Sequence, residues 1–347
     1  MPSLDFRSDN VGAVAPQIMS AVMRVNADTA DGYGRDPFTK SLAHIYAQAF
    51  DADVAVFPVA TGTAANAVAL SVLTPPYGAV LCHPTAHINV SECGAPEFFT
   101  GGAKIVPVPG PDGRIDPSEL RRALDRAGMG QPHRVQPAAL SLTQPTDLGT
   151  VYALDVLAEL CAIAKDHGLR IHMDGARLAN AVAALGCSLA DATWRCGVDI
   201  LSFGVTKNGG MNADAIIAFD RRFGVPLAFR LRRAGQTFSK MRYAAAQLAA
   251  YVENDLYRHL ASHANALSAR LAGRLADTDI PLVAPVEANE VFAYMPPPVV
   301  RSLESVALFH RYPDDVVRFV CRWDSCAADV DLLAHVIAQR GSAEASP

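Results

Sequence analysis

The sequence predicts an α/β protein, in which a mostly parallel sheet covered by helices on both faces is followed by a smaller α+β domain. Between residues 54 and 220, short apolar runs alternate with longer helical patterns. After Asp220 the pattern changes to long helical segments and then to short strands. Alternating strands and helices are typical of a parallel sheet with helices on both faces. The 347 residues suffice for one large and one small domain.

The seven predicted strands are short, apolar on both faces and bounded by Gly, Pro or polar residues, which indicates a sheet covered on both sides. They span residues 54–57, 79–82, 105–108, 138–142, 169–173, 200–203 and 215–219. An alanine-rich helix over 64–73 follows a polar start, and Asp116 with Pro117 opens a second helix. Gly168 closes a third helix over 153–167.

The two ends of the chain are predicted to lie outside this sheet. Near the N-terminus, residues 32–37 are expected to form an extended arm. Residues 221–275 are interpreted as two helices hinged around Gly235, and short strands are expected over 291–295 and 316–321. We therefore expect three parts: an N-terminal arm and helix over 1–48, a large α/β domain over 49–235, and a connecting helix with a small α+β domain over 236–347.

Composition excludes several classes of function. A net charge of −5 argues against nucleic acid or an acidic membrane surface as a partner. Residues 54–91 contain no Asp, Glu, Lys or Arg, but Pro and Gly break this stretch into short elements, so we expect buried soluble structure. The first seven residues lack the layout of a signal peptide, which favours a cytoplasmic protein. The seven cysteines include no CxxC pair, so we expect reduced core thiols and no metal site.

A candidate phosphate site follows the first strand of the sheet. Thr61, Gly62 and Thr63 stand between that strand and the alanine-rich helix. Small residues let backbone N–H groups approach a ligand, and the start of a helix carries partial positive charge. The alternative is an ordinary strand-to-helix turn with a threonine cap.

Two further strand ends carry ionisable side chains that could bind a ligand or react with it. Asp174 follows the strand over 169–173, and its carboxylate could bind a metal, hold a ribose, contact a protonated ring nitrogen or cap a helix. Lys207, one of only five lysines, lies in a glycine-rich loop after the strand over 200–203. A partly desolvated lysine has a lowered pKa and can attack a carbonyl group, although a phosphate-binding or solvated lysine is the alternative.

Together, the three positions match the needs of pyridoxal phosphate (PLP). The turn at Gly62 and Thr63 takes the phosphate, Asp174 keeps the pyridine nitrogen protonated, and Lys207 binds the aldehyde as a Schiff base. No G-x-G-x-x-G follows the first strand and no Walker-type loop is present, so a dinucleotide or nucleoside triphosphate site fits less well.

Seven motifs resemble the threonine aldolase family and occur in the family's order, over residues 6–323. They are Arg7-Ser8-Asp9-Asn10, Tyr33-Gly34, Thr61-Gly62-Thr63-Ala64-Ala65-Asn66, His83-Pro84-Thr85-Ala86-His87, Asp174-Gly175-Ala176-Arg177, Ser202-Phe203-Gly204-Val205-Thr206-Lys207-Asn208-Gly209 and Val317-Arg318-Phe319-Val320. The likeness is greatest to bacterial low-specificity L-threonine aldolases and phenylserine aldolase. It implies the aspartate-aminotransferase-like fold, PLP fold type I.

The resemblance also implies roles for individual residues. Lys207 would hold PLP covalently, and further cofactor contacts would come from Gly62, Thr63, His87, Asp174, Arg177 and Thr206. Ser8, Arg177 and Arg318 would hold the carboxylate of the amino-acid substrate. Arg233 would reach the phosphate in a neighbouring subunit and Tyr33 would belong to the same shared site, so a homodimer or homotetramer is expected.

The implied activity is cleavage of L-3-hydroxy-α-amino acids, such as threonine, allo-threonine or phenylserine, into glycine and an aldehyde. His87 is the first candidate for the base that removes the hydroxyl proton. Alternatives are transaldolation, β-elimination or transamination with the same cofactor, or a non-catalytic binding protein that kept the fold.

The sequence departs from the family at one place. Many family members carry a second histidine in a Glu-Asn-Thr-His stretch, whereas the matching stretch here reads Thr143-Gln144-Pro145-Thr146-Asp147. His133, upstream of the same strand, could replace it by reaching in from a loop. The alternative is that His133 is a surface loop residue.

Overall fold

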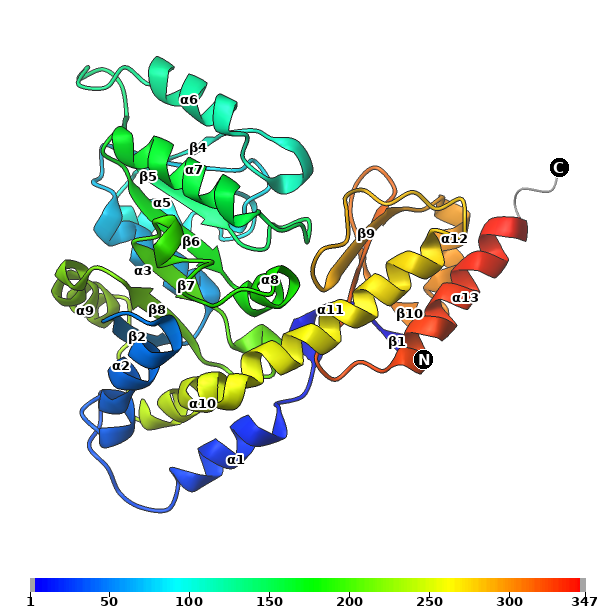
Figure 1. Ribbon diagram of the computed structural model, residues 1–347, viewed down its shortest axis with the longest axis horizontal. Coiled ribbons are helices and arrows are strands. Elements are labelled where there is room, and N and C mark those ends of the chain that lie inside the picture. Colours follow the sequence, from blue (N-terminus) through cyan, green and yellow to red (C-terminus); the bar gives the residue numbers. More distant parts are fainter. Residues whose placement is uncertain (1–3, 344–347) are drawn as a thin grey trace.

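The computed structural model describes residues 4–343, with side chains described up to residue 339. A large α/β part and a small α+β part lie side by side, and the long helix α11 (Leu256–Leu275) extends from one to the other (Figure 1). Among residues 4–343, no helix is long and apolar enough to cross a membrane.

The large part is built on a seven-stranded sheet with the order β2-β8-β7-β6-β5-β3-β4. Its strands are β2 (Ala55–Val59), β3 (Gly78–Cys82), β4 (Lys104–Pro107), β5 (Gln136–Thr143), β6 (Arg170–Gly175), β7 (Ile200–Phe203) and β8 (Asp214–Ala218). All seven predicted strands are thereby confirmed. Because β8 pairs antiparallel with both β2 and β7, its start lies at the same edge as the ends of the other strands.

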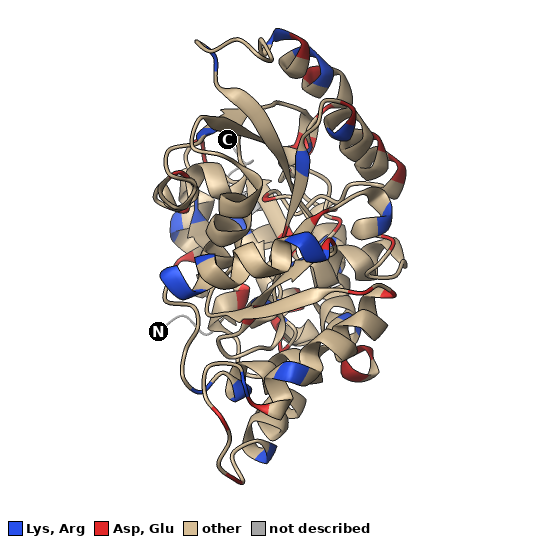
Figure 2. Ribbon diagram, turned by 90° about the vertical axis from the view of Figure 1, so that its left-hand side faces the viewer, with Lys and Arg blue, Asp and Glu red and all other residues tan. Residues whose placement is uncertain are grey.

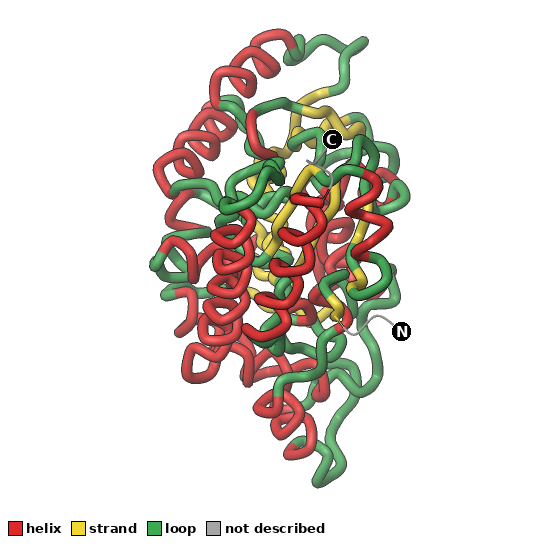
Figure 3. Tube along the Cα trace, turned by 90° about the vertical axis from the view of Figure 1, so that its right-hand side faces the viewer, coloured by secondary structure: helices red, strands yellow, loops and turns green. Residues whose placement is uncertain are grey.

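Helices cover both faces of this sheet because successive strand residues point to opposite sides. Ile200 and Ile216 pack against α3 (Gly62–Leu73) and α9 (Gly224–Arg233). Their neighbours Leu201 and Ile217 belong to the larger core on the other face, which includes buried residues of the helices below. These are α1 (Pro16–Arg24), α2 (Pro37–Phe50), α6 (Pro117–Arg126), α7 (Leu154–Asp166), α8 (Leu178–Leu185) and α10 (Arg242–Val252). Figure 3 shows the strands enclosed between helices, and Figure 2 shows charged residues mainly on the outer helices.

The small part has its own apolar core. Its antiparallel sheet has the order β11-β12-β9 and is joined by a two-stranded parallel pair, β1 with β10. The elements are β1 (Leu4–Asp5), β9 (Glu290–Tyr294), β10 (Ala307–Leu308), β11 (His310–Arg311), β12 (Val316–Val320), α12 (Pro297–Leu303) and α13 (Ala327–Ala343). The N-terminal strand thus belongs to the small part, where it pairs with β10, although the segment after it returns to the large part.

Two predictions about irregular segments are wrong. The predicted break around Gly235 is confirmed between α9 and α10, but the region after Asp220 contains a third helix, since Asn254 and Asp255 adopt left-handed φ angles of 51° and 54° between α10 and α11. The expected extended arm at 32–37 is a turn, in which Arg35 N donates to Gly32 O at 3.2 Å. The domain boundaries at residues 48 and 235 stay predictions.

The remaining elements are short. They are α4 (His87–Val90), α5 (Ala95–Thr100), and the 3₁₀ turns η1 (Asp9–Val11), η2 (Pro111–Gly113), η3 (Trp194–Cys196), η4 (Thr206–Asn208), η5 (Arg221–Phe223) and η6 (Glu253–Asp255). Three of them, α4, η1 and η4, lie at the edge of the large sheet that also carries a group of polar residues.

Candidate active site

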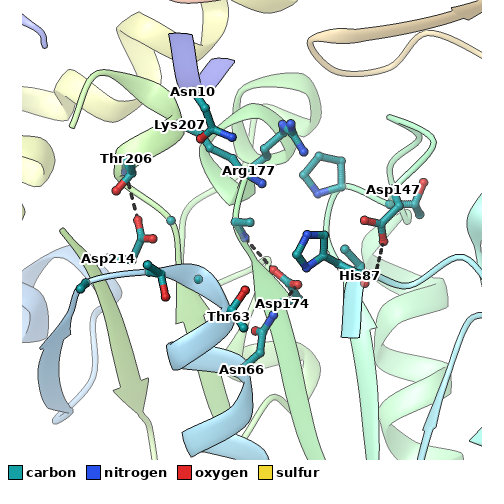
Figure 4. Close-up of a pocket in the computed structure, with 18 residues that line it drawn as sticks. Asn10, Thr63, Asn66, His87, Asp147, Asp174, Arg177, Thr206, Lys207 and Asp214 are labelled. Carbon is teal, nitrogen blue, oxygen red and sulfur yellow. Dashed lines mark hydrogen bonds between the residues drawn. The ribbon is translucent and has the colours of Figure 1, made fainter. Parts of the chain in front are cut away.

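A cavity of about 260 Å³ lies at the carboxyl edge of the large sheet. Its walls come from the segments after β2, β3, β5, β6 and β7, and from the first residue of the reversed strand β8 (Figure 4). Ligands of open α/β sheets bind at this edge because the loops that follow the strands meet there. The three strand-end positions singled out from the sequence, at Gly62, Asp174 and Lys207, all line this one cavity.

The turn before α3 presents free backbone donors to the cavity. Thr61 caps the helix, with its Oγ1 accepting the N–H of Ala64 at 3.1 Å. Neither Gly62 N nor Thr63 N has a hydrogen-bond partner among residues 4–343, and both residues line the cavity. Free N–H groups at a helix start form an anion site, which is the arrangement expected for a phosphate.

The turn that carries Lys207 is fixed by a buried carboxylate. Asp214 Oδ1 accepts the N–H groups of Val205 at 2.8 Å and Thr206 at 3.0 Å. Gly204 is required just before this turn, because a Cβ there would lie 2.1 Å from the carbonyl oxygen of Ala176. Burial raises the pKa of Asp214 above its usual value. These contacts hold Lys207 and Thr206 at the cavity wall.

Asp174 is buried at the end of β6 and belongs to a hydrogen-bonded chain of side chains. Asn66 Nδ2 donates to Asp174 Oδ2 and to Glu92 Oε1, both at 2.8 Å. The backbone N–H of Ala176 reaches Asp174 Oδ1 at 3.0 Å. Asn66, one turn into α3, therefore fixes the orientation of the carboxylate that faces the cavity.

His87 continues this chain at the start of α4. Its Nδ1 lies 2.8 Å from Glu92 Oε1, and this hydrogen bond raises the pKa of the ring above its usual value. The buried Glu92 carboxyl in turn has a raised pKa, chiefly because it is desolvated. Ligand atoms of His87, Glu92 and Asp174 lie within 4.8 Å of one another, a spacing that metal ligands also show, but the hydrogen bonds described here already use these groups.

A second group of charges closes the cavity where the two parts of the molecule meet. Arg177 donates from Nε and Nη2 to the two carboxylate oxygens of Asp9, at 2.6 and 3.0 Å. The buried Glu290 of β9 pairs with Arg177 at 3.3 Å and with Arg318 of β12 at 3.4 Å. Desolvation disfavours the charged form of Arg177, but its acidic neighbours outweigh this and raise its pKa.

The donor set of this cavity fits PLP. One amine (Lys207), one buried carboxylate (Asp174), one ring (His87) and two unpaired N–H groups at a helix start line the same space. Each is the type of group that the aldehyde, the ring nitrogen, the ring face and the phosphate of PLP need, respectively.

Other residues predicted for the site lie elsewhere in this chain. Ser8 is buried, and its Oγ accepts the N–H of Asn10 at 3.1 Å as the cap of η1. Tyr33 is 50% exposed in a separate hollow, where the Arg232 guanidinium lies 5.1 Å from its ring centre. Arg233 is exposed at the end of α9.

His133 does not reach the cavity in this chain. It is exposed in the loop before β5, whereas the cavity lies at the opposite end of that strand. His133 is thus not placed to act on a substrate in its own chain, and its catalytic role stays a prediction.

Sequence reasoning missed five buried or half-buried polar residues: Asn66, Glu92, Asp147, Asp214 and Glu290. Asp147 follows the end of β5, so the rule about strand ends could have identified it. Asp214 lies at the start of a strand, and only the reversed direction of β8 brings it to the site. No feature of the sequence around Glu92 or Glu290 marks either residue as part of a site.

Comparisons with known proteins agree with this geometry. A family model described as beta-eliminating lyase matches residues 5–297. A low specificity L-threonine aldolase of Pseudomonas aeruginosa is 39% identical over 336 residues, which make up 96% of each chain. The solved structure of a Leishmania major threonine aldolase superposes with a TM-score of 0.89 at 26% identity, over 96% of this chain and 100% of that one.

A more distant structure shows the fold alone. An aspartate aminotransferase of Thermus thermophilus superposes with a TM-score of 0.72 at 15% identity, over 97% of this chain and 91% of that one. The predicted aspartate-aminotransferase-like fold is thereby confirmed. The chain belongs to the beta-eliminating lyase family and, within it, to the threonine aldolases.

Proposed function

We propose that this protein is a PLP-dependent aldolase that cleaves L-3-hydroxy-α-amino acids, such as threonine, allo-threonine and phenylserine, into glycine and an aldehyde. One observation carries the proposal: Lys207, Asp174 and the free N–H groups of Gly62 and Thr63 line a single cavity. The Pseudomonas relative, which is named for this activity, supports the choice of reaction.

The cofactor would be held by residues of the large sheet's edge. Lys207 would bind the aldehyde, Asp174 would contact the ring nitrogen, and Gly62 and Thr63 would bind the phosphate with help from Thr206. When bound, PLP supplies a conjugated ring that can take up the electron pair of a bond broken at the α-carbon. His87 would lie against the ring face.

The carboxylate of the substrate would be bound where Arg177 and Arg318 converge. Arg177 lines the cavity, and Arg318 Nε is buried without a hydrogen-bond partner among residues 4–343. Both guanidinium groups are already held by Glu290, so their planes are positioned before substrate arrives. Ser8, which does not line the cavity in this chain, stays a predicted further contact because it directly precedes Asp9.

Cleavage also needs a group that accepts the proton of the β-hydroxyl. The sequence suggests His87 for this role. The structure places a second ionisable group, Asp147, beside it in the cavity wall.

The proposal is tested with the purified protein and L-threonine. We expect a yellow protein, bleached by borohydride with the reduced cofactor attached to Lys207, that releases acetaldehyde and glycine in equal amounts. Release of ammonia and a keto acid would indicate β-elimination instead. A colourless protein that binds no PLP would refute the proposal.

We also propose that the working unit is a homodimer or homotetramer with shared sites. Tyr33 and Arg233 lie outside the cavity of their own chain, and α9 exposes the apolar side chains of Val225 and Phe229, 68% and 74% accessible. Large exposed apolar side chains on one helix favour an interface. Light scattering of the purified protein measures the assembly, and an active monomer would contradict it.

A further inference from the structure

Asp147 lies in the cavity wall beside His87. Its Oδ2 accepts the backbone N–H of His87 at 3.2 Å. Its Oδ1 accepts no hydrogen bond from any residue between 4 and 343. Figure 4 shows the carboxylate next to the His87 ring, on the opposite side of the cavity from Thr206 and Asp214. One carboxylate oxygen therefore anchors the side chain, and the other is free to contact a ligand.

The loop that carries Asp147 is held firmly in place. Thr146 N donates to Thr150 O at 2.8 Å, and the two threonine hydroxyls lie 2.7 Å apart. Gly149 closes the turn with a φ of +75°, and a Cβ there would lie 3.1 Å from Glu290. The loop is thus packed between the sheet edge and β9, so the position of Asp147 does not depend on a bound ligand.

The surroundings make Asp147 suited to proton transfer near neutral pH. Burial, and then the charge of Asp174, raise the pKa of Asp147 to about 7. Charged and titratable groups face it from several elements: Cys82, His87, Tyr152, Asp174, Arg177, Lys207 and Glu290. The hydrogen bond that His87 Nδ1 donates to Glu92 favours the protonated form of His87. A protonated His87 has no lone pair left to accept a proton, so Asp147, whose Oδ1 is free, is the neighbour that can act as the base.

We propose that Asp147 is the catalytic base of this aldolase and accepts the β-hydroxyl proton of the substrate, while His87, held by Glu92, acts as the neighbouring cation. The inference rests on the proposed function and names a residue that the sequence motifs left without a role.

The proton balance of the reaction closes with this assignment. The O–H bond breaks as Asp147 takes the proton, the Cα–Cβ bond breaks, and the oxygen and Cβ form the carbonyl group of the aldehyde. The electron pair of the broken bond remains with the α-carbon, which takes up one proton to become glycine. Asp147 then releases its proton to water. One proton is thus taken up and one released, so no net proton is consumed.

The test uses Asp147→Asn in the full-length protein loaded with PLP. The amide keeps the size of the side chain but cannot accept the proton. We expect the rate of L-threonine cleavage to fall by about 100-fold or more. The loss of wild-type rate as pH drops below about 7 should disappear in this variant. Asp147→Glu should restore part of the rate, and Asp166→Asn, at an exposed site on α7, should behave as wild type.

Two further readouts separate a base from a structural residue. Exchange of the α-protons of glycine with heavy water does not involve a β-hydroxyl, so Asp147→Asn should keep it. In NMR of isotope-labelled histidine, the pKa of His87 should fall when the charge of Asp147 is removed. Wild-type cleavage by Asp147→Asn, or loss of glycine exchange together with cleavage, would overturn the inference. Failure of wild-type protein to bind PLP would instead refute the proposed function.

Discussion

The two sides of the cavity are built differently. On the cofactor side, Gly62 and Lys207 lie just after the ends of strands in one sheet, and Asp174 lies at the end of a third strand. On the carboxylate side, Asp9, Arg177, Glu290 and Arg318 come from both parts of the molecule, and Arg318 Nη2 contacts the carbonyl oxygen of Arg7, 311 residues away. The first side uses backbone N–H groups and neutral donors, whereas the second pairs buried charges with one another.

The cofactor side is thus built from the strand ends of one sheet, and the carboxylate side from residues that are far apart in the chain. Strand-end loops of a parallel sheet bring their residues together whenever the sheet forms. Buried charges are stable only when every partner is present, because an unpaired charge in the interior is costly. The carboxylate side therefore depends on how the small part packs against the large part, and the cofactor side does not. Three predictions test this contrast.

The largest effect is expected on the cofactor side from Lys207→Ala. Loss of the amine should lower turnover by more than about 1,000-fold, because no other residue can bind the cofactor covalently there. Binding through the phosphate should partly survive, since Gly62 and Thr63 are unchanged. Steady-state rates and PLP binding measure the two effects. The exposed Lys165→Ala on α7 serves as the control, and full activity of Lys207→Ala would contradict the assignment.

As the pH falls, the cofactor side should lose its contribution to the free energy of unfolding before the carboxylate side does. Beneath Asp174, the buried His172 bridges Ser141 at 2.8 Å and Ser202 at 3.0 Å, and burial lowers its pKa to about 4. The unfolded chain binds this proton below the usual pKa of 6.5, so stability is lost as pH falls from 6.5 to 4, by about 3 kcal/mol.

The carboxylate side should lose its contribution to stability only at a lower pH. Burial alone would raise the pKa of Asp9, but the charges of Arg177 and Lys207 hold it below 3.8, so its contribution is lost only below that value. Urea unfolding between pH 4 and 7 should show a flatter pH dependence for His172→Gln than for wild type. Asp9→Asn should already be destabilised at neutral pH. An unchanged slope in His172→Gln would show that this histidine is not buried in its neutral form.

The smallest effect is expected from Arg318→Ala. Loss of a charge-assisted hydrogen bond to the substrate carboxylate costs about 2 kcal/mol, so KM should rise by roughly 10- to 100-fold with a smaller change in kcat. Arg311→Ala, an exposed arginine on the neighbouring strand β11, is the matched control. An unchanged KM in Arg318→Ala would place the substrate carboxylate elsewhere.

The same difference between local and long-range contacts explains which parts of the fold and of the site could be predicted from the sequence. Apolar runs with polar boundaries identified all seven strands of the large sheet to within two residues at either end. The positions of Lys207, Asp174 and the turn at Gly62 relative to strand ends singled them out as candidate cofactor residues, and all three line one cavity. The helix break at Asn254 and the turn at residues 32–35 were missed, because single residues in the left-handed conformation and short turns leave no periodic pattern.

By itself, the sequence determined the mostly parallel sheet and the strand ends at which the candidate cofactor residues lie, since each depends on side chains close together in the chain. Only the tertiary structure decided that Asp147 lies against His87 and that Glu290 joins two arginines. The contacts of Asp147 with His87 and of Glu290 with Arg177 link residues that are 60 or more positions apart. The proton affinities of these groups follow from burial and from neighbouring charges, which exist only after the two parts of the molecule have packed together.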